Sequence, residues 1–520
     1  MDALNILIGK CVNRLPTFQF LTAMPQLISR ISHPNSKVQE VLEAIIVTVL
    51  GLYPQQSLWH LMAVAKSSHK GRVQRVSSIF SKAKSSQPGL SQKIQHAESL
   101  TDEFLKLCNF PISKNVTKLS MNKDFKNLIN LVNMNIATII PLQTSLTVAL
   151  PAGNNSETNH KPFASDLPLM IGTMLFNLLI NFILGFKDQV DIMPSLQRPR
   201  RITILASDGQ EYIFLCKPDD DLRKDSRLME FNSIVNKLLK KSVEARKRNL
   251  HIRTYAVIPL NEKCGLIQWV SNMNGYRNII VKAYRERNMY VNYQEIKDML
   301  AGQSKENTLE IFKNKIIPKH PPIFYTWFLE SFPEPAKWLA SRHSYTSTIA
   351  VMSMVGHIVG LGDRHGENIL FDHLTGECLH VDLNCLFEKG KLFEVPERVP
   401  FRLTHNMVDA FGVTGINGAF RKSCEVSMEI LRDNRELLMS ILETFLHDPL
   451  CEWTSRSKSS VSSGNVQAVK ILSDINKKLE GSVEGSRVLV NVQGQVDALI
   501  HEATKPENLA FMYIGWAPYL

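Results

Sequence analysis

One stretch of this sequence places polar side chains on a tight turn between a helix and a strand. The run 349–361 is apolar at helical spacing and ends in Gly360-Leu361-Gly362, which stops the helix. Asp363 is therefore exposed on the following turn, and Asn368 comes five positions later, directly before the strand-like run 369–371. The pattern predicts a turn that presents Asp363 and Asn368 at one end of a strand.

A second turn then brings the chain back to the end of the strand at which Asp363 and Asn368 are predicted to lie. The segment 372–377 predicts a hairpin, and Asp382 follows Asn368 by 14 residues. Phosphoryl transfer needs a carboxylate that orients the attacking hydroxyl, and acidic and amide ligands for magnesium. In the catalytic loop of protein kinases Asp and Asn are also five apart, but their histidine precedes the Asp, whereas His365 follows Asp363 here. The sequence therefore predicts a phosphoryl-transfer site.

A candidate cation for nucleotide phosphates lies upstream. The alternating runs 202–206 and 211–216 are joined by a Ser-Asp-Gly-Gln turn, which is a strong hairpin signal. Lys217 directly follows the second run, and Asp225 is predicted to cap the helix that comes next. Strand-like runs at 255–259 and 266–270 complete a small mixed lobe.

The first 150 residues have a different character. Apolar residues recur at helical spacing in 22–31, 38–52 and 58–64, and we find no strand-like alternation or catalytic set there. Paired helices of this kind usually form a solenoid or a packing collar. From about 280 to 450 the pattern is again mostly helical, so the fold class is α+β.

Composition agrees with a folded chain of several parts. The 520 residues carry a formal net charge of +11, which suggests acidic partners such as phosphates, and eight scattered cysteines without a C-x-x-C pair, which favours a reducing compartment. A Ser-rich stretch, 454–464, predicts a flexible linker.

The segment 167–184 stands apart because it has 18 residues without a charge, the length of a membrane span. Two asparagines and a proline weaken that interpretation, and no Lys/Arg asymmetry flanks the segment. It could be an insertion, an intron retained in the gene sequence or a membrane span.

The motifs LGDRHGENIL, HVDLN and CKPDDDLRKDSRLMEF closely resemble those of the phosphatidylinositol 3-kinase-related protein kinases. The ending, GQVDALIHEATKPENLAFMYIGWAPYL, resembles the short FATC segment of that family, and FLTAMPQLISRI near the start resembles the end of its helical FAT region. The resemblance implies a bilobal PI3K/PI4K-like kinase fold preceded by an all-α region. The corresponding division is 1–150 helical, 151–198 linker with the apolar segment, 199–272 N-lobe, 273–453 C-lobe, 454–487 regulatory linker and 488–520 FATC.

The resemblance also implies roles for single residues. Lys217 would hold the ATP phosphates beside Asp220 and Asp225, and Trp269 and Val270 would lie at the hinge against adenine.

In the second lobe, the resemblance implies that Asp363 orients the substrate hydroxyl and that His365 stabilises charge at the transferred phosphate. Asn368 and Asp382 would bind Mg²⁺, or Mn²⁺ in its place. The activation loop would be 383–403, including Leu383, Asn384, Pro400, Phe401 and Arg402.

Two residues depart from the pattern, because Leu383 stands where Phe is usual and Gln268 where a hinge glutamate is expected. Members of the family begin with a long helical-repeat region, so we expect this chain to be the C-terminal part of a longer protein.

The implied function is a nuclear serine/threonine kinase of DNA-damage and replication-stress checkpoint signalling, which prefers Ser or Thr followed by Gln. Implied partners are an adaptor protein, checkpoint activators and a second copy in a dimer of heterodimers, with indirect DNA contact and no membrane association.

Two alternatives of function remain. A phosphoinositide kinase shares the Asp-Arg-His-x-x-Asn loop, but the activation loop here is mixed in sign rather than basic. An inactive scaffold would have lost Lys217 or the metal ligands, and all of them are present.

Overall fold

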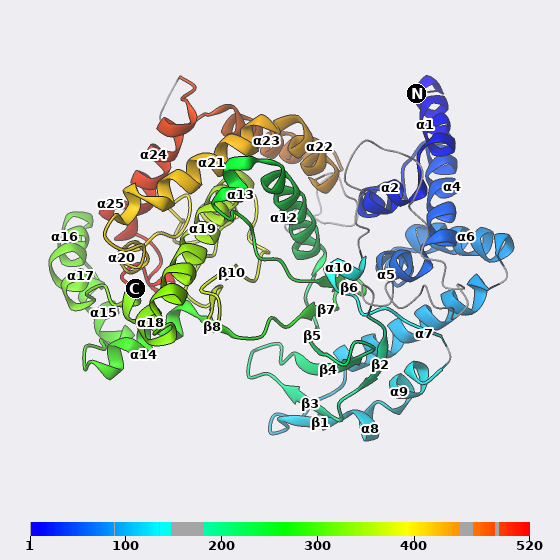
Figure 1. The fold of residues 1–520 in the computed structure, drawn as a ribbon, viewed down its shortest axis with the longest axis horizontal. Coiled ribbons are helices and arrows are strands. Elements are labelled where there is room, and N and C mark those ends of the chain that lie inside the picture. Colours follow the sequence, from blue (N-terminus) through cyan, green and yellow to red (C-terminus); the bar gives the residue numbers. More distant parts are fainter. Residues whose placement is uncertain (1, 88, 135, 147–180, 447–460, 484–487) are drawn as a thin grey trace. The chain divides into compact units, whose positions relative to one another are not determined.

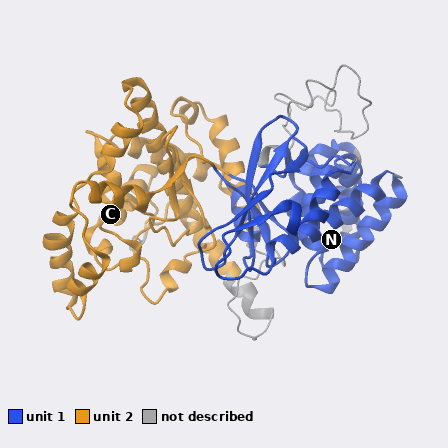
Figure 2. Cartoon of the chain, turned by 90° about the horizontal axis from the view of Figure 1, so that it is seen from below, with its two compact units in different colours: residues 1–229, 255–270, 444–455 blue, residues 230–254, 271–443, 456–520 orange. Residues whose placement is uncertain are grey.

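The computed structural model describes residues 2–87, 89–134, 136–146, 181–446, 461–483 and 488–520. The chain divides into two compact units, shown in Figure 2. Unit 1 comprises 1–229, 255–270 and 444–455, and unit 2 comprises 230–254, 271–443 and 456–520.

Unit 1 begins with helices, as predicted. The expected helices at 22–31, 38–52 and 58–64 are confirmed as α3, α4 and α5. Helices α4 and α5 are labelled in Figure 1. Prolines stand in the first turn of α3 and α5, where no backbone N–H is needed. Asn35 caps α4 by accepting a hydrogen bond from the N–H of Val38. The helices are α1 (Asp2–Arg14), α2 (Thr17–Thr22), α3 (Met24–Ser29), α4 (Ser36–Leu52), α5 (Pro54–Ala65), α6 (Lys70–Ser86), α7 (Leu90–Cys108), α8 (Met121–Asp124), α9 (Lys126–Val132) and α10 (Gln143–Leu146).

A seven-stranded antiparallel sheet forms the rest of unit 1. Its order is β1-β3-β4-β5-β7-β6, with β2 also paired to β4. The predicted hairpin is confirmed, because β4 pairs with β5 from Arg200↔Cys216 to Leu205↔Glu211, and Gly209 adopts φ 76° in the turn. The strands are β1 (Lys118–Ser120), β2 (Ile183–Phe186), β3 (Gln189–Ile192), β4 (Arg200–Ala206), β5 (Glu211–Lys217), β6 (Val257–Pro259) and β7 (Gly265–Gln268).

The sheet extends into ranges where we expected no strand. β1 lies in the range predicted as helical, and β2 and β3 lie in the range predicted as linker. These strands are only three or four residues long, too short for alternation to stand out in the sequence. Their pairing places the buried side chains of Val190 and Ile192 in the core of the sheet.

Helix α7 joins the helices to the sheet of unit 1. Phe104, Leu107 and Cys108 on its buried face belong to the same apolar core as Ile202 and Phe214 of the sheet. The apolar residues that recur at helical spacing on α7 therefore pack in one core with those that alternate along β4 and β5.

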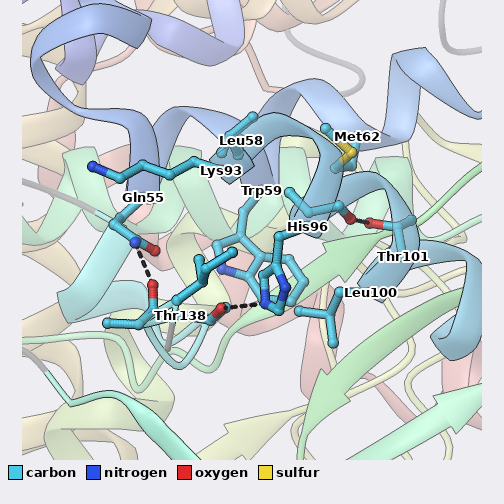
Figure 3. Close-up of a pocket in the computed structure, with 12 residues that line it drawn as sticks. Gln55, Leu58, Trp59, Met62, Lys93, His96, Leu100, Thr101 and Thr138 are labelled. Carbon is cyan, nitrogen blue, oxygen red and sulfur yellow. Dashed lines mark hydrogen bonds between the residues drawn. The ribbon is translucent and has the colours of Figure 1, made fainter. Parts of the chain in front are cut away.

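A small cavity of about 20 Å³ lies in unit 1 between α5, α7 and the segment 136–138, which is room for about one water molecule (Figure 3). Trp59 and Leu100 form apolar walls, and Nε2 of the buried His96 lies 3.1 Å from Oγ1 of Thr138.

Unit 2 is mostly helical. Helix α12 (Arg223–Lys241) leads into it from unit 1, and Asp225 lies within its first turn instead of capping it. The 25-residue helix α19 is buried along much of its length, and Gly360 ends it at φ 60°. The helices that follow α12 are α13 (Val243–Lys247), α14 (Tyr276–Glu286), α15 (Tyr293–Leu300), α16 (Lys305–Ile311), α17 (Ile317–Lys319), α18 (Phe324–Ser331), α19 (Pro335–Val359), α20 (His405–Asp409), α21 (Ala419–Asp433) and α22 (Arg435–Leu446).

A three-stranded antiparallel sheet of unit 2 lies against α19. It has the order β10-β9-β8, from β8 (Met273–Gly275), β9 (Ile369–Asp372) and β10 (Cys378–His380). The N–H of Cys378 donates to Oγ1 of Thr348 at 3.0 Å, which ties β10 to α19.

The C-terminal part of unit 2 differs from the prediction of a flexible linker over 454–487. Residues 461–480 form helix α23 (Val461–Glu480), which packs against α19 and α21. Its buried side chains Ala468, Leu472, Ile475 and Leu479 follow helical spacing, so burial of this stripe outweighs the serine-rich composition upstream. Helices α24 (Val492–Thr504) and α25 (Pro506–Leu509) follow.

The apolar segment 167–184 lies outside the described residues up to position 180. Its end, together with Gly185 and Phe186, forms β2 of the sheet. In the ranges that the structure describes, no helix is both long and apolar enough to cross a bilayer.

Candidate active site

The predicted catalytic turn directly follows α19. The N–H of Gly362 donates to the carbonyl of Cys385 at 2.8 Å, and Asp363 adopts φ 58°, in the left-handed region that non-glycine residues seldom occupy. Nδ2 of Asn368 donates to the carbonyl of Asp363 at 2.9 Å. The turn therefore joins Asp363 and Asn368, as the sequence predicts.

The hairpin β9–β10 brings Asp382 to the same edge. The two strands pair from Phe371↔Cys378 to Ile369↔His380, and the N–H of Val381 donates to the carbonyl of Asn368 at 3.0 Å. Asp382 adopts φ 53°, so both aspartates of the candidate site lie in the left-handed region.

Arg364 holds these two segments together, a role that sequence reasoning missed. Its Nε donates to the carbonyl of Gly362 at 2.9 Å, and its Nη1 donates to the carbonyl of Val381 at 2.8 Å. Its Nη2 donates to the carbonyl of Asp382. Arg364 is 3% exposed, so the fixed fork of its guanidinium sets the spacing between the Asp363 turn and Asp382.

His365 lies beside Asp363. Its Nδ1 accepts a hydrogen bond from the N–H of Glu367 at 3.2 Å, and its Nε2 lies 3.9 Å from Oδ1 of Asp363. Burial lowers the pKa of His365, and burial raises the pKa of Asp363. In the neutral ring the proton is therefore on Nε2, directed away from the Glu367 amide, where it can donate to an oxygen atom near Asp363.

The donor set at Asn368 and Asp382 fits a hard cation. The NH₂ group of Asn368 is used on Asp363, which leaves its side-chain oxygen for a ligand bond. Asp382 contributes a carboxylate, whose Oδ1 lies 3.4 Å from Nδ2 of Asn384. Mg²⁺ takes one or two protein oxygens and completes its shell with phosphates and water. Among the described residues no group of three or more His, Cys, Asp or Glu side chains could hold a metal by itself.

The first half of the predicted activation loop is anchored in unit 2. Leu383 is fully buried in the position where the family pattern has Phe. Glu388, at φ 60°, forms an ion pair with Lys478 of α23, and Lys478 also donates to the carbonyl of His357 at 2.7 Å. Burial lowers the pKa of Lys478, whereas Glu388 acts in the opposite direction.

The second half of this loop joins the C-terminal segment. Arg402 is buried, and its Nη1 and Nη2 donate to the carbonyls of Trp516 and Ala517 at 2.6 and 2.8 Å. Pro400 and Phe401 precede it, and Phe401 is buried. The C-terminal residues are therefore part of the support of the candidate site.

The predicted nucleotide-binding residues lie in unit 1. Nζ of Lys217, at the end of β5, lies 2.9 Å from Oδ2 of Asp220, and the N–H of Asp220 donates to the carbonyl of Lys263 at 2.7 Å. Asp225 is 3% exposed. The structure thus brings Lys217 together with Asp220 at the end of β5, an inner strand of the sheet.

The predicted hinge residues follow β7. The N–H of Trp269 donates to the carbonyl of Ile213 at 2.8 Å, and Val270 is the last residue of this part of unit 1. Gln268, which stands where a glutamate was expected, accepts a hydrogen bond from the N–H of Ala256 at 3.0 Å through its Oε1. The backbone of the hinge segment is therefore tied into the sheet despite the departure.

The predicted site residues thus form two groups. One group in unit 1 contains Lys217, Asp220, Asp225, Trp269 and Val270, and the other in unit 2 contains Asp363, His365, Asn368 and Asp382. The second group has the local geometry that the motifs predict, whereas in the first group Asp225 lies inside α12 instead of capping it.

Comparison with known protein families shows that one family model covers both groups. The model described as "Phosphatidylinositol 3- and 4-kinase" matches residues 211–455. The model described as "Serine/threonine-protein kinase ATR-like, HEAT repeats" matches 3–101, and the "FATC domain" model matches 490–520. The chain therefore carries a kinase domain of the phosphatidylinositol 3- and 4-kinase class, with a helical segment before it and a FATC segment after it.

Similar proteins cover the whole chain. Protein kinase rad3 of Schizosaccharomyces pombe is 47% identical over 100% of this chain and 21% of its own length. Serine/threonine-protein kinase ATR of Arabidopsis thaliana is 45% identical over 100% of this chain and 19% of its own length. A solved structure titled "FAT and kinase domain of CtTel1" has a TM-score of 0.83 at 30% identity, and the match covers 100% of this chain and 35% of that one.

The chain belongs to the phosphatidylinositol 3-kinase-related protein kinase family, with the kinases named ATR, Rad3 and Mec1 among its relatives. The predicted fold class, a PI3K-like kinase domain after a helical region, is confirmed. The chain spans about a fifth of the length of the curated relatives it matches.

Proposed function

We propose that this chain is the catalytic part of a serine/threonine protein kinase of the ATR type, which transfers the γ-phosphate of ATP to Ser or Thr. The observation that carries this proposal is the joint placement of Asp363, His365, Asn368 and Asp382 around the β9–β10 hairpin. The names of the relatives, serine/threonine-protein kinase ATR and protein kinase rad3, support a protein substrate over a lipid.

The chemistry assigns one task to each group. Asp363 orients the substrate hydroxyl and accepts its proton as the oxygen bonds to the γ-phosphorus and the bond to the β–γ bridging oxygen breaks, which releases ADP. His365, with its lowered pKa, donates a hydrogen bond to the phosphoryl oxygens. Asn368 and Asp382 would hold Mg²⁺, or Mn²⁺, which neutralises charge on the phosphates when bound.

We assign the binding of the nucleotide to residues of unit 1. Lys217 would contact the ATP phosphates, with Asp220, which lies 2.9 Å from it, and Asp225 as acidic neighbours. Trp269 and Val270 would contact adenine through backbone and ring.

The biological setting follows the relatives. We propose a Ser/Thr-Gln preference read by the activation loop 383–403, a nuclear location and a role in DNA-damage checkpoint signalling. We also propose an adaptor protein and checkpoint activators as partners. One solved relative is titled "Complete CtTel1 dimer with C2 symmetry", which supports a dimeric assembly for the full protein.

The test compares transfer of labelled phosphate from ATP to three acceptors. We expect transfer to a Ser-Gln peptide, none to the matched Ala-Gln peptide and none to phosphatidylinositol vesicles. Transfer to the vesicles alone would overturn the protein-kinase proposal in favour of a lipid kinase, and no transfer to any acceptor would favour an inactive scaffold.

The variant Asp363→Asn tests the assignment of the catalytic carboxylate. Asn tolerates the left-handed backbone at φ 58° better than Ala does, so this change removes the charge and keeps the turn. We expect transfer to fall by about 10²–10⁴-fold while the affinity for an ATP analogue stays within about twofold. Activity that survives this change would show that Asp363 is not the catalytic carboxylate.

A further inference from the structure

We propose that Glu397, near the end of the predicted activation loop, is a positioning residue that holds the backbone of Asp363 in its catalytic conformation. Its Oε1 accepts a hydrogen bond of 2.9 Å from the N–H of Asp363. The proposal rests on the proposed function for its catalytic consequence, whereas the contact itself is a property of the fold.

The backbone of Asp363 needs such support. At φ 58° a non-glycine residue is in a sparsely occupied region of backbone conformation, and such a conformation persists where the surroundings impose it. Two side chains do so here, because Glu397 binds the N–H of Asp363 and Asn368 binds its carbonyl at 2.9 Å. One of these side chains comes from the catalytic turn, and the other comes from the activation loop.

Two glycines make room for the Glu397 carboxylate. A Cβ atom added at Gly362 or at Gly390 would overlap Oε2 of Glu397. Neither glycine adopts a positive φ, so space rather than backbone conformation requires glycine at these positions. The N–H of Glu397 also donates to the carbonyl of Gly390 at 3.0 Å, which closes the loop around the carboxylate.

The surroundings of the Glu397 carboxylate disfavour its charged form. Burial raises the pKa of Glu397, and the negative charge of Asp363 raises it further, while the hydrogen bond from the Asp363 backbone lowers it. A group that served only to cap a loop could do so in solvent at lower cost. The contact instead links the catalytic turn to residue 397, so displacement of the activation loop removes the support of Asp363.

Three variants separate positioning from charge. Glu397→Ala removes the acceptor, Glu397→Gln keeps an acceptor oxygen at the same place, and Glu310→Ala removes a carboxylate from an exposed position of α16, outside the activation loop. For Glu397→Ala we expect kcat to fall by about 10–100-fold with the KM for ATP within about twofold, since misplacement of a catalytic group acts mainly on the chemical step. Glu397→Gln should recover most of the lost kcat, and Glu310→Ala should remain near wild type.

Gly390→Ala provides an independent test. Its new methyl group should expel the Glu397 carboxylate and lower kcat about as much as Glu397→Ala does. In the double variant the two losses should not add, because the second change removes a contact already lost. Additive losses, or a kcat of Glu397→Ala equal to wild type while Asp363→Asn is inactive, would overturn the inference and leave the proposed function intact.

Hydrogen–deuterium exchange of the segment 361–368 gives a readout without activity. Glu397→Ala should speed exchange there, and Glu310→Ala should not. If the wild-type chain transfers no phosphate, faster exchange in Glu397→Ala than in the wild type would still support the contact while the proposed function fails. Unchanged exchange in Glu397→Ala would contradict the positioning role whatever the activity.

Discussion

Nη1 of Arg402 donates a 2.6 Å hydrogen bond to the backbone carbonyl of Trp516, and the guanidinium carbon lies 4.1 Å from the centre of the Trp516 indole ring. Nη1 of Arg402 also lies 3.4 Å from the carbonyl oxygen of Arg364 in the catalytic turn. A single buried cation thus connects the C-terminal segment to the turn that carries Asp363.

We predict that Arg402→Lys destabilises the chain by about 2–3 kcal/mol, because an ammonium group can replace neither the planar fork nor the stacking. Burial lowers the pKa of Arg402 to about 10, so the wild-type group stays charged at neutral pH. Urea unfolding measures the effect. The control Arg398→Lys, whose guanidinium lies 5.0 Å from the ring centre of Phe511, should cost less than about 1 kcal/mol. Equal costs for the two variants would contradict the prediction.

We predict that the thermal stability of the chain depends on pH through a contact of the β9–β10 hairpin, which ends near Asp382. Nε2 of His251 lies 3.1 Å from Oε1 of Glu377, and this hydrogen bond raises the pKa of His251 and lowers that of Glu377. Arg253 faces both Glu377 and Asp372, at 2.7 and 2.5 Å, and opposes part of the rise at His251.

A raised folded-state pKa stabilises the fold below the ordinary histidine value of about 6.5, and this contribution is lost as pH rises through the folded pKa. The lowered pKa of Glu377 contributes above its unfolded value and is lost as pH falls through the folded one. We therefore expect the Tm to fall as the pH rises above about 6.5 and through the raised pKa of His251. Glu377→Gln and His251→Gln should each flatten this slope, and the double variant should add nothing more. A slope that persists in both variants would place its origin elsewhere.

The ion pair between Glu388 and Lys478 predicts energetic coupling between the activation loop and α23. Lys478→Met should destabilise the chain by about 1–2 kcal/mol, less than a fully buried pair would, because the Glu388 side chain is 37% exposed. Glu388 keeps Lys391 at 3.2 Å as a second partner, so a double-mutant cycle with Glu388→Gln is needed to isolate the pair. A coupling energy of zero would show that the contact has no energetic consequence.

The sequence predicts those parts of the candidate site whose signals lie close together in the chain. Asp363, Asn368 and Asp382 fall within a helix stop, a strand and a hairpin, whose signals lie within a few residues of each group. The contacts of Arg364 with Val381 and Asp382 span 17 and 18 positions, and that of Glu397 with Asp363 spans 34. Packing of the loop sets these contacts. Nothing in the sequence around Glu397 indicates that its carboxylate turns inward, although nearby glycines are a signal of close approach.

The missed elements have different causes. The strands β1, β2 and β3 are too short for alternation, and pairing with β4 or with one another stabilises them. For α23 the signal was present, since Leu472, Ile475 and Leu479 recur at helical spacing, but the serine-rich residues upstream suggested a linker. Local composition was therefore a weaker guide than periodicity.

The structural role of α23 leads to a prediction within one helix. Leu472 is 8% exposed and faces the interior of unit 2, whereas Val469 on the same helix is 57% exposed. If α23 is an integral part of the fold, Leu472→Ala should lower the free energy of unfolding by about 2–3 kcal/mol, because it removes buried apolar surface and leaves a cavity. Val469→Ala should cost less than about 0.5 kcal/mol. Both changes put the good helix former Ala into the helix, so propensity cannot explain a difference between them. Urea unfolding of the two variants decides the point, and equal small effects would mean that 461–480 behaves as the linker first predicted from its composition.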